Sequence, residues 1–286
     1  MCGTDFGLYA VGGVIGMREG ADAEKALLLA RVDDLFRRAR RYEPCVGPFL
    51  TPAEQSWLGG QIRKNDTDAF AVFYGGYDGS ERNRLFVLPG YLANGNGEYT
   101  AAFVRDAVPE LAAEAVAVLA VAGSGYRKLT HRDFLGSLLA LGVERSKVGD
   151  IVVTDNAHAL IFCDRTIATF LIQELHRVGN DAVKVTMSKI GDDFRVERRF
   201  LPIHDTVASP RLDNIVSALI GTSREKAQGA IREGAVEVNY EVADRNDKMP
   251  GEGAVISIRG HGKYVIRSVS EQTKKGRYRL YADQYD

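Results

Sequence analysis

The hydrophobic pattern in the first third of the chain predicts two helices followed by a β-hairpin. A partly helical spacing of apolar residues runs over 22–42, and a capping box opens a second helix over 51–63. Residues 69–74 and 85–88 are rich in β-branched and aromatic residues and flank a turn rich in Gly, Asp and Ser. We therefore expect one helix–helix–hairpin unit over 21–108.

The middle of the chain alternates strand and helix patterns in the order β-α-β-β-α-β. The predicted strands are 115–121, 150–154, 158–163 and 183–187, and the predicted helices are 130–141 and 165–178. This order is typical of a ferredoxin-like layout, which many RNA-recognition modules share, so we expect a ferredoxin-like (RRM-like) domain over 109–202. Its sheet offers little for base stacking, because the first strand is aliphatic and the third contributes only Phe162. A scaffold or docking role is therefore favoured for it.

The last third, over 203–286, begins with two short helices joined by a tight turn. Ser209 and Pro210 suit a helix start, and apolar residues then recur at helical spacing until Gly221. A second capping box follows at once, and Gly234 ends the second helix. Strands are expected at 236–238, 254–258 and 263–269. The fold class predicted for the whole chain is therefore α+β.

The helix pair carries the motif of a known RNA-binding domain. Three matches occur in order and with the correct spacing: Arg211-Leu212-Asp213, Ser223-Arg224 with Ala227, and Gly234-Ala235-Val236-Glu237-Val238-Asn239. They resemble the S4-like (αL-type) domain, in which paired helices lie on structured RNA. The chain departs from that pattern at Tyr240, where the family often has Gly in the hairpin turn.

The resemblance implies that basic and polar side chains of this unit contact phosphates and sugars. An arginine donates a fork of hydrogen bonds to phosphate, and each neutralised phosphate releases counterions. The predicted RNA-contacting residues are Arg211, Asn214, Ser223, Arg224, Lys226, Gln228, Arg232, Asn239, Arg259 and Lys263. The alternative is that Arg211 pairs with a nearby acid and that the stripe of Arg224, Gln228 and Arg232 is ordinary helix surface.

Further matches, two of them outside the C-terminal unit, extend the resemblance over nearly all of the chain from about residue 24. They lie at 129–139, 148–151 and 211–214, and together they resemble the bacterial YlmH family. This family is associated with a cell-division gene neighbourhood and, in some members, with ribosome-associated quality control. The resemblance implies a non-catalytic protein that binds ribosomal RNA of the large subunit together with tRNA and supports alanine tailing of a stalled chain.

Composition and charge restrict how such a protein binds RNA. The 286 residues are 45% hydrophobic and 26% charged, which excludes a disordered chain. Lys and Arg number 37 against 38 Asp and Glu, so a uniformly basic, histone-like protein is excluded. Any RNA-binding surface must therefore be local.

The cysteines and the N-terminal segment bear on cofactors and location. Three cysteines, far apart, form neither a disulfide framework nor a metal-binding pair, and five scattered histidines suggest no metal site. We expect a cytoplasmic monomer without metal, cofactor or membrane span. The apolar run 6–17 is interrupted by glycines and lacks the basic start of a signal peptide. Residues 1–20 are therefore expected to be a mobile extension, with Met1 or Met17 as the native start.

Motifs that resemble catalytic signatures are incomplete. His131-Arg132-Asp133 matches a kinase catalytic loop, but Leu138 stands where that loop requires Asn. The segments 123–125 and 187–189 are too short to indicate a nucleotide site or a synthetase site. No catalytic constellation is predicted, so the protein is not expected to be an enzyme.

Two other functions stay open at this point. The first is an RNA-modifying enzyme with an active site around Asp150, Asp155 and Asp164. The second is a cell-division adaptor in which RNA binding is secondary.

Two basic segments each have a structural and a functional interpretation. The arginines of 37–41 suit the end of a helix dipole and would also suit phosphates. Residues 274–281 alternate basic and other residues, which predicts an edge strand, and their tyrosines could also stack on bases.

Overall fold

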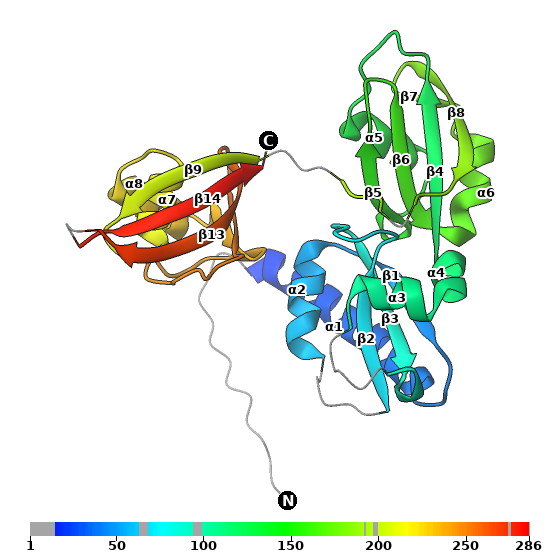
Figure 1. The fold of residues 1–286 in the computed structure, drawn as a ribbon, viewed down its shortest axis with the longest axis horizontal. Helices are drawn as coiled ribbons and strands as arrows, with labels where there is room; N and C mark the ends of the chain where they lie inside the picture. Colours follow the sequence, from blue (N-terminus) through cyan, green and yellow to red (C-terminus); the bar gives the residue numbers. More distant parts are fainter. Residues whose placement is uncertain are drawn as a thin grey trace, which may run out of the picture.

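The computed structural model describes residues 15–62, 68–93, 99–191, 193–196, 200–273 and 276–285. Its strands form three antiparallel sheets with the orders β1-β3-β2, β5-β6-β4-β8-β7 and β11-β10-β12-β13-β14-β9. Figure 1 shows the first two sheets stacked end to end and the third standing apart from them. The predicted α+β class is confirmed.

The N-terminal unit contains the predicted helices and hairpin together with further elements. They are α1 (Ile15–Ala39), β1 (Cys45–Leu50), α2 (Pro52–Gln61), β2 (Ala69–Tyr74), β3 (Asn83–Pro89), the 3-10 turn η1 (Gly90–Leu92), α3 (Ala101–Ala107) and α4 (Pro109–Ala115). Sequence reasoning missed β1, because Gly47 and Pro48 interrupt its strand pattern and only its pairing with β3 defines it.

The start of α1 lies inside the segment that was expected to be a mobile extension. The helix begins at Ile15, so residues 15–20 of the expected mobile extension are helical. The remainder of that extension, 1–14, lies outside the described residues.

The central unit has the predicted ferredoxin-like arrangement. Its elements are β4 (Val116–Gly123), α5 (His131–Ala140), η2 (Arg145–Lys147), β5 (Val148–Val153), β6 (His158–Asp164), α6 (Arg165–Glu174), β7 (Arg177–Val178) and β8 (Asp181–Ser188). Alternate residues of the two central strands, among them Leu119 and Ile161, point toward α5 and α6 and form a core with Leu138 and Leu171. The helix predicted over 165–178 ends at Glu174, because the chain turns there into the short strand β7.

The C-terminal unit packs two helices against a six-stranded sheet. Its elements are β9 (Phe200–Val207), α7 (Leu212–Leu219), α8 (Arg224–Arg232), β10 (Val236–Val238), β11 (Glu241–Val242), β12 (Val255–Ile258), β13 (Gly262–Gln272) and β14 (Tyr278–Tyr285). The boundary expected at 202 falls inside β9, which pairs with β14 along its length. β14 also pairs with β13, so it is an internal strand and not the edge strand expected over 274–281.

The N-terminal and central units share a hydrophobic core. Phe162 of β6 is fully buried on the sheet face opposite α5 and α6, and its ring centre lies 4.8 Å from that of Tyr77. A side chain covered in this way is unavailable for base stacking, as expected from the sequence. Gly149 of β5 allows this contact, because a Cβ atom there would lie 2.6 Å from Cε1 of Phe49 and 3.2 Å from Cβ of Phe162.

The Gly149→Ala variant is therefore expected to lose about 1–3 kcal/mol of unfolding free energy, through overpacking of the shared core. Thermal and urea unfolding would measure this loss. Gly136→Ala is the matched control, since Gly136 lies inside α5 with open space around it and its replacement should stabilise the helix by about 0.5–1 kcal/mol. Equal stability of the two variants would contradict the shared core.

Among the described residues, no helix combines the length and the apolar character needed to cross a bilayer.

Candidate nucleic-acid interface

Local capping and apolar packing position the α7–α8 pair. The first N–H groups of α7, from Leu212 and Asp213, donate to the backbone carbonyls of Lys248 (2.7 Å) and Asn246 (3.1 Å). Ser223 caps α8, because its hydroxyl accepts the N–H of Lys226 at 3.3 Å. The apolar faces of both helices are buried against the sheet. Each helix start is thus satisfied, and the polar faces of the pair lie at the surface.

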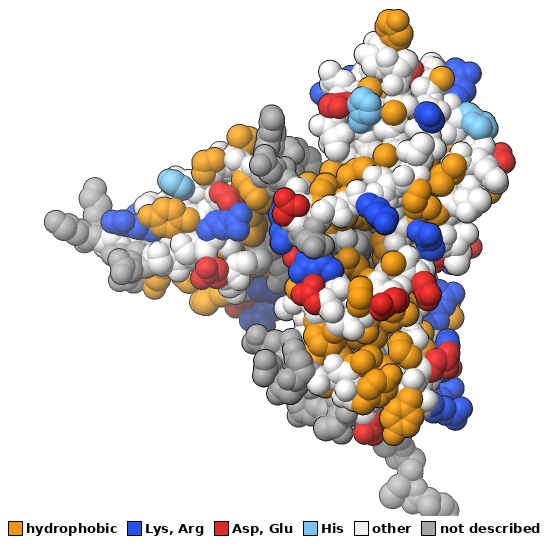
Figure 2. Space-filling model, turned by 45° about the vertical axis from the view of Figure 1, so that its right-hand side comes forward, with side chains coloured by type: hydrophobic (Ala, Val, Ile, Leu, Met, Phe, Trp, Pro, Cys, Tyr) orange, Lys and Arg blue, Asp and Glu red, His pale blue; other side chains and the backbone are white. Residues whose placement is uncertain are grey.

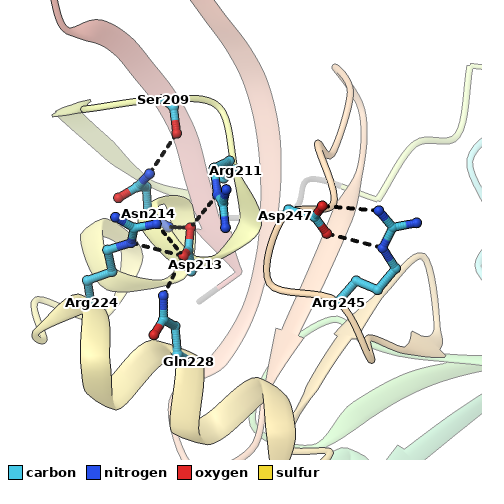
Figure 3. A network of polar contacts seen from close by, with 8 residues as sticks. All are labelled: Ser209, Arg211, Asp213, Asn214, Arg224, Gln228, Arg245 and Asp247. Atoms are coloured by element: carbon cyan, nitrogen blue, oxygen red, sulfur yellow. Dashed lines mark hydrogen bonds and ion pairs between the residues drawn. The ribbon is translucent and has the colours of Figure 1, made fainter.

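Asp213 is the centre of a polar network that joins the two helices (Figure 3). Its side chain has 0% exposure, yet it accepts hydrogen bonds from Nε of Arg224 (2.9 Å) and Nε2 of Gln228 (2.8 Å). Nε of Arg211 lies 3.4 Å from its other oxygen, and the N–H of Asn214 donates to that oxygen at 2.9 Å. One buried carboxylate therefore orients two arginines and a glutamine from two helices.

The charge of Asp213 is maintained by these partners. Burial alone would raise its pKa, but the hydrogen bonds from Gln228 and Arg224 and the positive charges of Arg224 and Arg211 lower the pKa below its ordinary value of 3.8. The carboxylate is therefore ionised at neutral pH, and the network combines two cations with one anion.

Both arginines keep part of the guanidinium at the surface. The side chain of Arg211 is 36% exposed and that of Arg224 is 52% exposed. Arg211 points Nε at Asp213, whereas Arg224 points both Nε and Nη2 at it, and the other N–H groups of the two guanidinium groups have no partner in the described chain. A guanidinium held in this way can donate to a phosphate without first being ordered, which reduces the entropic cost of binding.

The remaining predicted residues of the helix pair have different positions. Asn214 donates to the Ser209 hydroxyl at 2.8 Å, which fixes the approach to α7. Ser223 is a cap, as described above. Lys226 and Arg232 are exposed on α8 and form no ion pair with any residue that the structure describes. They are the two cations of this face that RNA can use without disturbing an internal contact.

The predicted residues of the sheet lie elsewhere in the unit. Asn239 donates its N–H to the carbonyl of Val255 (2.7 Å) and accepts the N–H of Val255 on its side chain (2.9 Å), so it holds the hairpin together. Nζ of Lys263 lies 5.0 Å from the ring centre of Tyr240. Arg259 is exposed, with a 3.5 Å contact to the carbonyl of Gly234. None of these three contacts the Asp213 network.

The turn at Tyr240, where the chain departs from the S4 pattern, is formed without glycine. Asn239 and Tyr240 both have positive φ values, 52° and 67°, as a two-residue hairpin turn between β10 and β11 requires. A tyrosine in this region is strained, and the cation–π contact with Lys263 offsets part of that strain. The departure thus changes the residue but not the hairpin.

Sequence reasoning left Asp213 out of the predicted site, although the motif contains it. The pairing of Arg211 with an acid, which the sequence offered as the alternative to RNA contact, is present, and the same acid also holds Arg224. One signal in the sequence could have indicated this role. Asp213 is an acid next to Leu212 in the first turn of a helix whose other buried residues are apolar. The two arginines therefore have a structural role, yet some of the N–H groups of each guanidinium are left to donate to another partner.

The three aspartates considered for an enzyme active site serve three separate structural contacts. Asp150 accepts the Tyr77 hydroxyl and two backbone N–H groups. Asp155 holds the turn before His158. Asp164 caps α6 and binds Nζ of Lys147 at 2.8 Å. Within the described ranges, no group of His, Cys, Asp and Glu side chains could hold a metal ion.

The basic run at the end of α1 has contacts of its own. Arg37 pairs with Asp34, and Arg38 pairs with Glu43, in exposed positions where such pairs contribute little stability. These pairs fit the interpretation of this segment as solvated helix surface.

Comparison with known proteins agrees with the geometry of the site. The family model "Putative RNA-binding domain in YlmH" matches residues 116–192, and the S4 domain model matches residues 210–256, which include α7, α8 and the Asp213 network. A protein of Bacillus subtilis (strain 168), "Ribosome-associated protein quality control protein P2", is 30% identical over 241 residues, covering 84% of this chain and 87% of that protein. The solved structure of "Cell division protein ylmH from Streptococcus pneumoniae" covers 64% of this chain and 96% of its own, with 19% identity and a TM-score of 0.41. The chain belongs to the YlmH family of RNA-binding proteins and carries an S4 domain at its C-terminal end.

Proposed function

We propose that this protein is a non-catalytic, cytoplasmic factor of ribosome-associated quality control. As a monomer without metal or cofactor, it binds ribosomal RNA of the large subunit together with tRNA, including peptidyl-tRNA. The observation that carries the proposal is the pair of half-exposed guanidinium groups held by Asp213 within the S4 domain. The name of the Bacillus subtilis relative supports the assignment to quality control.

The S4 helix pair suits a folded RNA because its cations are held in place before binding. Arg211 and Arg224 offer oriented forks, while Lys226 and Arg232 add exposed charges on the same helix pair. Contacts of this kind go to phosphates and sugars, so they recognise the shape of an RNA rather than its sequence.

A protein that binds two RNA surfaces at once can act on ribosome complexes without catalysing a reaction. If one surface belongs to the subunit and the other to tRNA, the full binding energy is available only when both are present. The protein then shifts the population of ribosome complexes toward the state in which tRNA occupies that position. Alanine tailing of a stalled chain would be supported in this way.

A sedimentation experiment tests the proposal. Wild-type protein in a cell lysate is expected to migrate with large ribosomal subunits in a sucrose gradient and to be released as the salt concentration rises. Lys226→Ala/Arg232→Ala removes two exposed charges and no internal contact. The slope of its log affinity against log salt concentration should therefore be shallower than that of wild type, by the amount that corresponds to about two phosphate contacts. Arg211→Ala/Arg224→Ala should release the protein at lower salt.

Arg165→Ala provides the matched control, since Arg165 is exposed on α6 of the central unit. Melting curves of all variants separate loss of folding from loss of binding. The assignment to the large subunit would be wrong if wild-type protein stayed at the top of the gradient at low salt. A ribosome-bound wild type with unaffected S4 variants would show that another surface makes the contact.

A further inference from the structure

The central domain needs an RNA-binding surface other than the middle of its sheet. Its open face is covered at one end by the N-terminal unit, where Phe162 is fully buried. Beyond this contact, Ala120 and Ala122 of β4 face the same way and are small, Leu160 of β6 is aliphatic, and the ring of His158 beside Ala122 is bound to Asp155. A stacking platform of the kind used by RNA-recognition sheets is therefore not available there.

The loop between β4 and α5 is fixed at its base. Gly123 donates its N–H to the carbonyl of Ala157, and Leu129, which is buried, donates its N–H to the carbonyl of Asn156, both at 2.8 Å. Both ends of the loop are thus bonded to the turn between β5 and β6. The segment between them forms the far tip of the domain, at the top of Figure 1.

A buried carboxylate holds the first half of this loop. Asp181 of β8 is 9% exposed and accepts the hydroxyl of Ser124 at 2.5 Å and its N–H at 3.0 Å. Gly125 then turns the chain with φ 82°, a conformation that suits glycine. The loop therefore emerges from the domain in a defined direction.

The next residues point into solvent. Tyr126 is 97% exposed, the highest exposure of any large hydrophobic or aromatic side chain that the structure describes. Arg127 and Lys128 follow it, are exposed, and form no ion pair within the described residues. In Figure 2 a hydrophobic side chain projects at the top of the molecule, with basic, acidic and histidine side chains below it. An aromatic ring costs free energy when it is left in water, so this position favours a partner.

The acids around the tip are already engaged. Asp133 accepts the N–H and hydroxyl of Thr130, and these bonds keep its pKa below the ordinary value. Asp155 is bound to His158, and Asp181 to Ser124. Lys184, which pairs with Ala122 at the base of the loop, adds a further exposed cation. The tip therefore presents an exposed aromatic side chain next to the exposed cations Arg127 and Lys128, which form no ion pair in the described chain, although the charge of Asp133 acts on Arg127.

We propose that this loop is a second RNA contact, in which Tyr126 stacks on an unpaired base while Arg127 and Lys128 bind the adjacent phosphates. Unpaired nucleotides are commonly recognised by aromatic stacking combined with cations along the backbone. The inference rests on the proposed function and gives the central domain its own target, unpaired RNA, beside the structured RNA of the S4 helix pair. It is consistent with the position of the loop inside residues 116–192.

The test uses the full-length protein and two labelled RNAs, a hairpin with an unpaired loop and the blunt duplex of its stem. Tyr126→Ala is expected to bind the hairpin about tenfold more weakly and the duplex as wild type does. Tyr126→Phe keeps the stacking ring, so its affinity should stay within about twofold of wild type. Arg127→Ala removes one phosphate contact, so the slope of log affinity for the hairpin against log salt concentration should become shallower by about 0.7.

Tyr91→Ala is the matched control, because it removes another exposed tyrosine, 63% exposed, from the N-terminal unit. The inference is wrong if Tyr126→Ala binds both RNAs as wild type does. Loss of binding by Lys226→Ala/Arg232→Ala in the same assay would still support the proposed function. If Tyr126→Ala reduced sedimentation with ribosomes but not binding to the hairpin, the loop would contact a protein instead, which also overturns the inference.

Discussion

Replacing Asp213 by alanine is expected to destabilise the S4 domain by about 3 kcal/mol and to abolish RNA binding at physiological salt. The buried carboxylate is the common acceptor for Arg224 and Gln228, and the counter-charge of Arg211. Its removal deprives both guanidinium groups of their shared carboxylate and removes the polar link between α7 and α8. Hydrogen exchange of the α7 and α8 amides would measure the stability, and filter binding would measure the affinity.

Asp244→Ala is the control for this prediction, since it removes an exposed aspartate of the same unit that forms no hydrogen bond or ion pair in the described chain and acts only through its charge on the neighbouring Arg245. It should change stability by no more than about 0.5 kcal/mol. A folded Asp213→Ala protein with wild-type affinity would show that the arginines bind RNA without being positioned.

The lowered pKa of Asp213 predicts how the stability of the S4 domain depends on pH. Because the folded pKa lies below 3.8, the network contributes its full stability above that value and loses it as the pH falls through the folded pKa. The stability difference between wild type and Asp213→Asn should therefore be constant near neutral pH and should shrink below about pH 4. Urea unfolding followed at several pH values would show this convergence, and a difference that persisted at acid pH would contradict it.

Replacing Arg84 by alanine is the second change with a large expected effect, about 3–4 kcal/mol of unfolding free energy. Arg84 lies on β3, and its nearly buried side chain donates to the carbonyls of Gly47 and Ala115 at 2.6 Å each. It also lies 3.4 Å from Asp164 of the central unit. The change leaves two buried carbonyls without donors and removes an ionic contact between the two units.

The expected result is a separate, earlier melting transition of the N-terminal unit, which calorimetry would detect. Arg37→Ala provides the comparison, because its partner Asp34 is exposed and the pair contributes at most about 1 kcal/mol. A single, unshifted transition in Arg84→Ala would show that the hydrophobic core alone joins the units.

The elements that sequence patterns predicted correctly are those with strong local signals. The capping box that opens the helix over 51–63 occurs as predicted, with the Thr51 side chain accepting the backbone N–H of Glu54. The order of central strands and helices was also predictable, because apolar periodicity differs between the two kinds of element. The S4 motif placed the helix pair correctly, but the predicted caps were wrong: α7 begins at Leu212 without a side-chain cap, not after Ser209, and Ser223 caps α8 one residue after the start of the predicted capping box.

Elements defined by distant partners could not be predicted in this way. β1 contains Gly47 and Pro48 and is a strand because it pairs with β3, and β9 is a strand because β14 lies beside it. The internal position of β14 likewise depends on a segment about 75 residues earlier in the chain.

The candidate site divides in the same way. The resemblance to the S4 domain selected Arg211, Arg224 and Gln228 and implied RNA as their partner, and the scarcity of aromatic residues in the predicted central strands argued against base stacking there. Only the tertiary structure decided that Asp213 is buried among them and that Tyr126 projects from the far tip of the central domain. Burial and orientation depend on contacts between segments distant in the chain, and those contacts arise when the sheets and helices pack together.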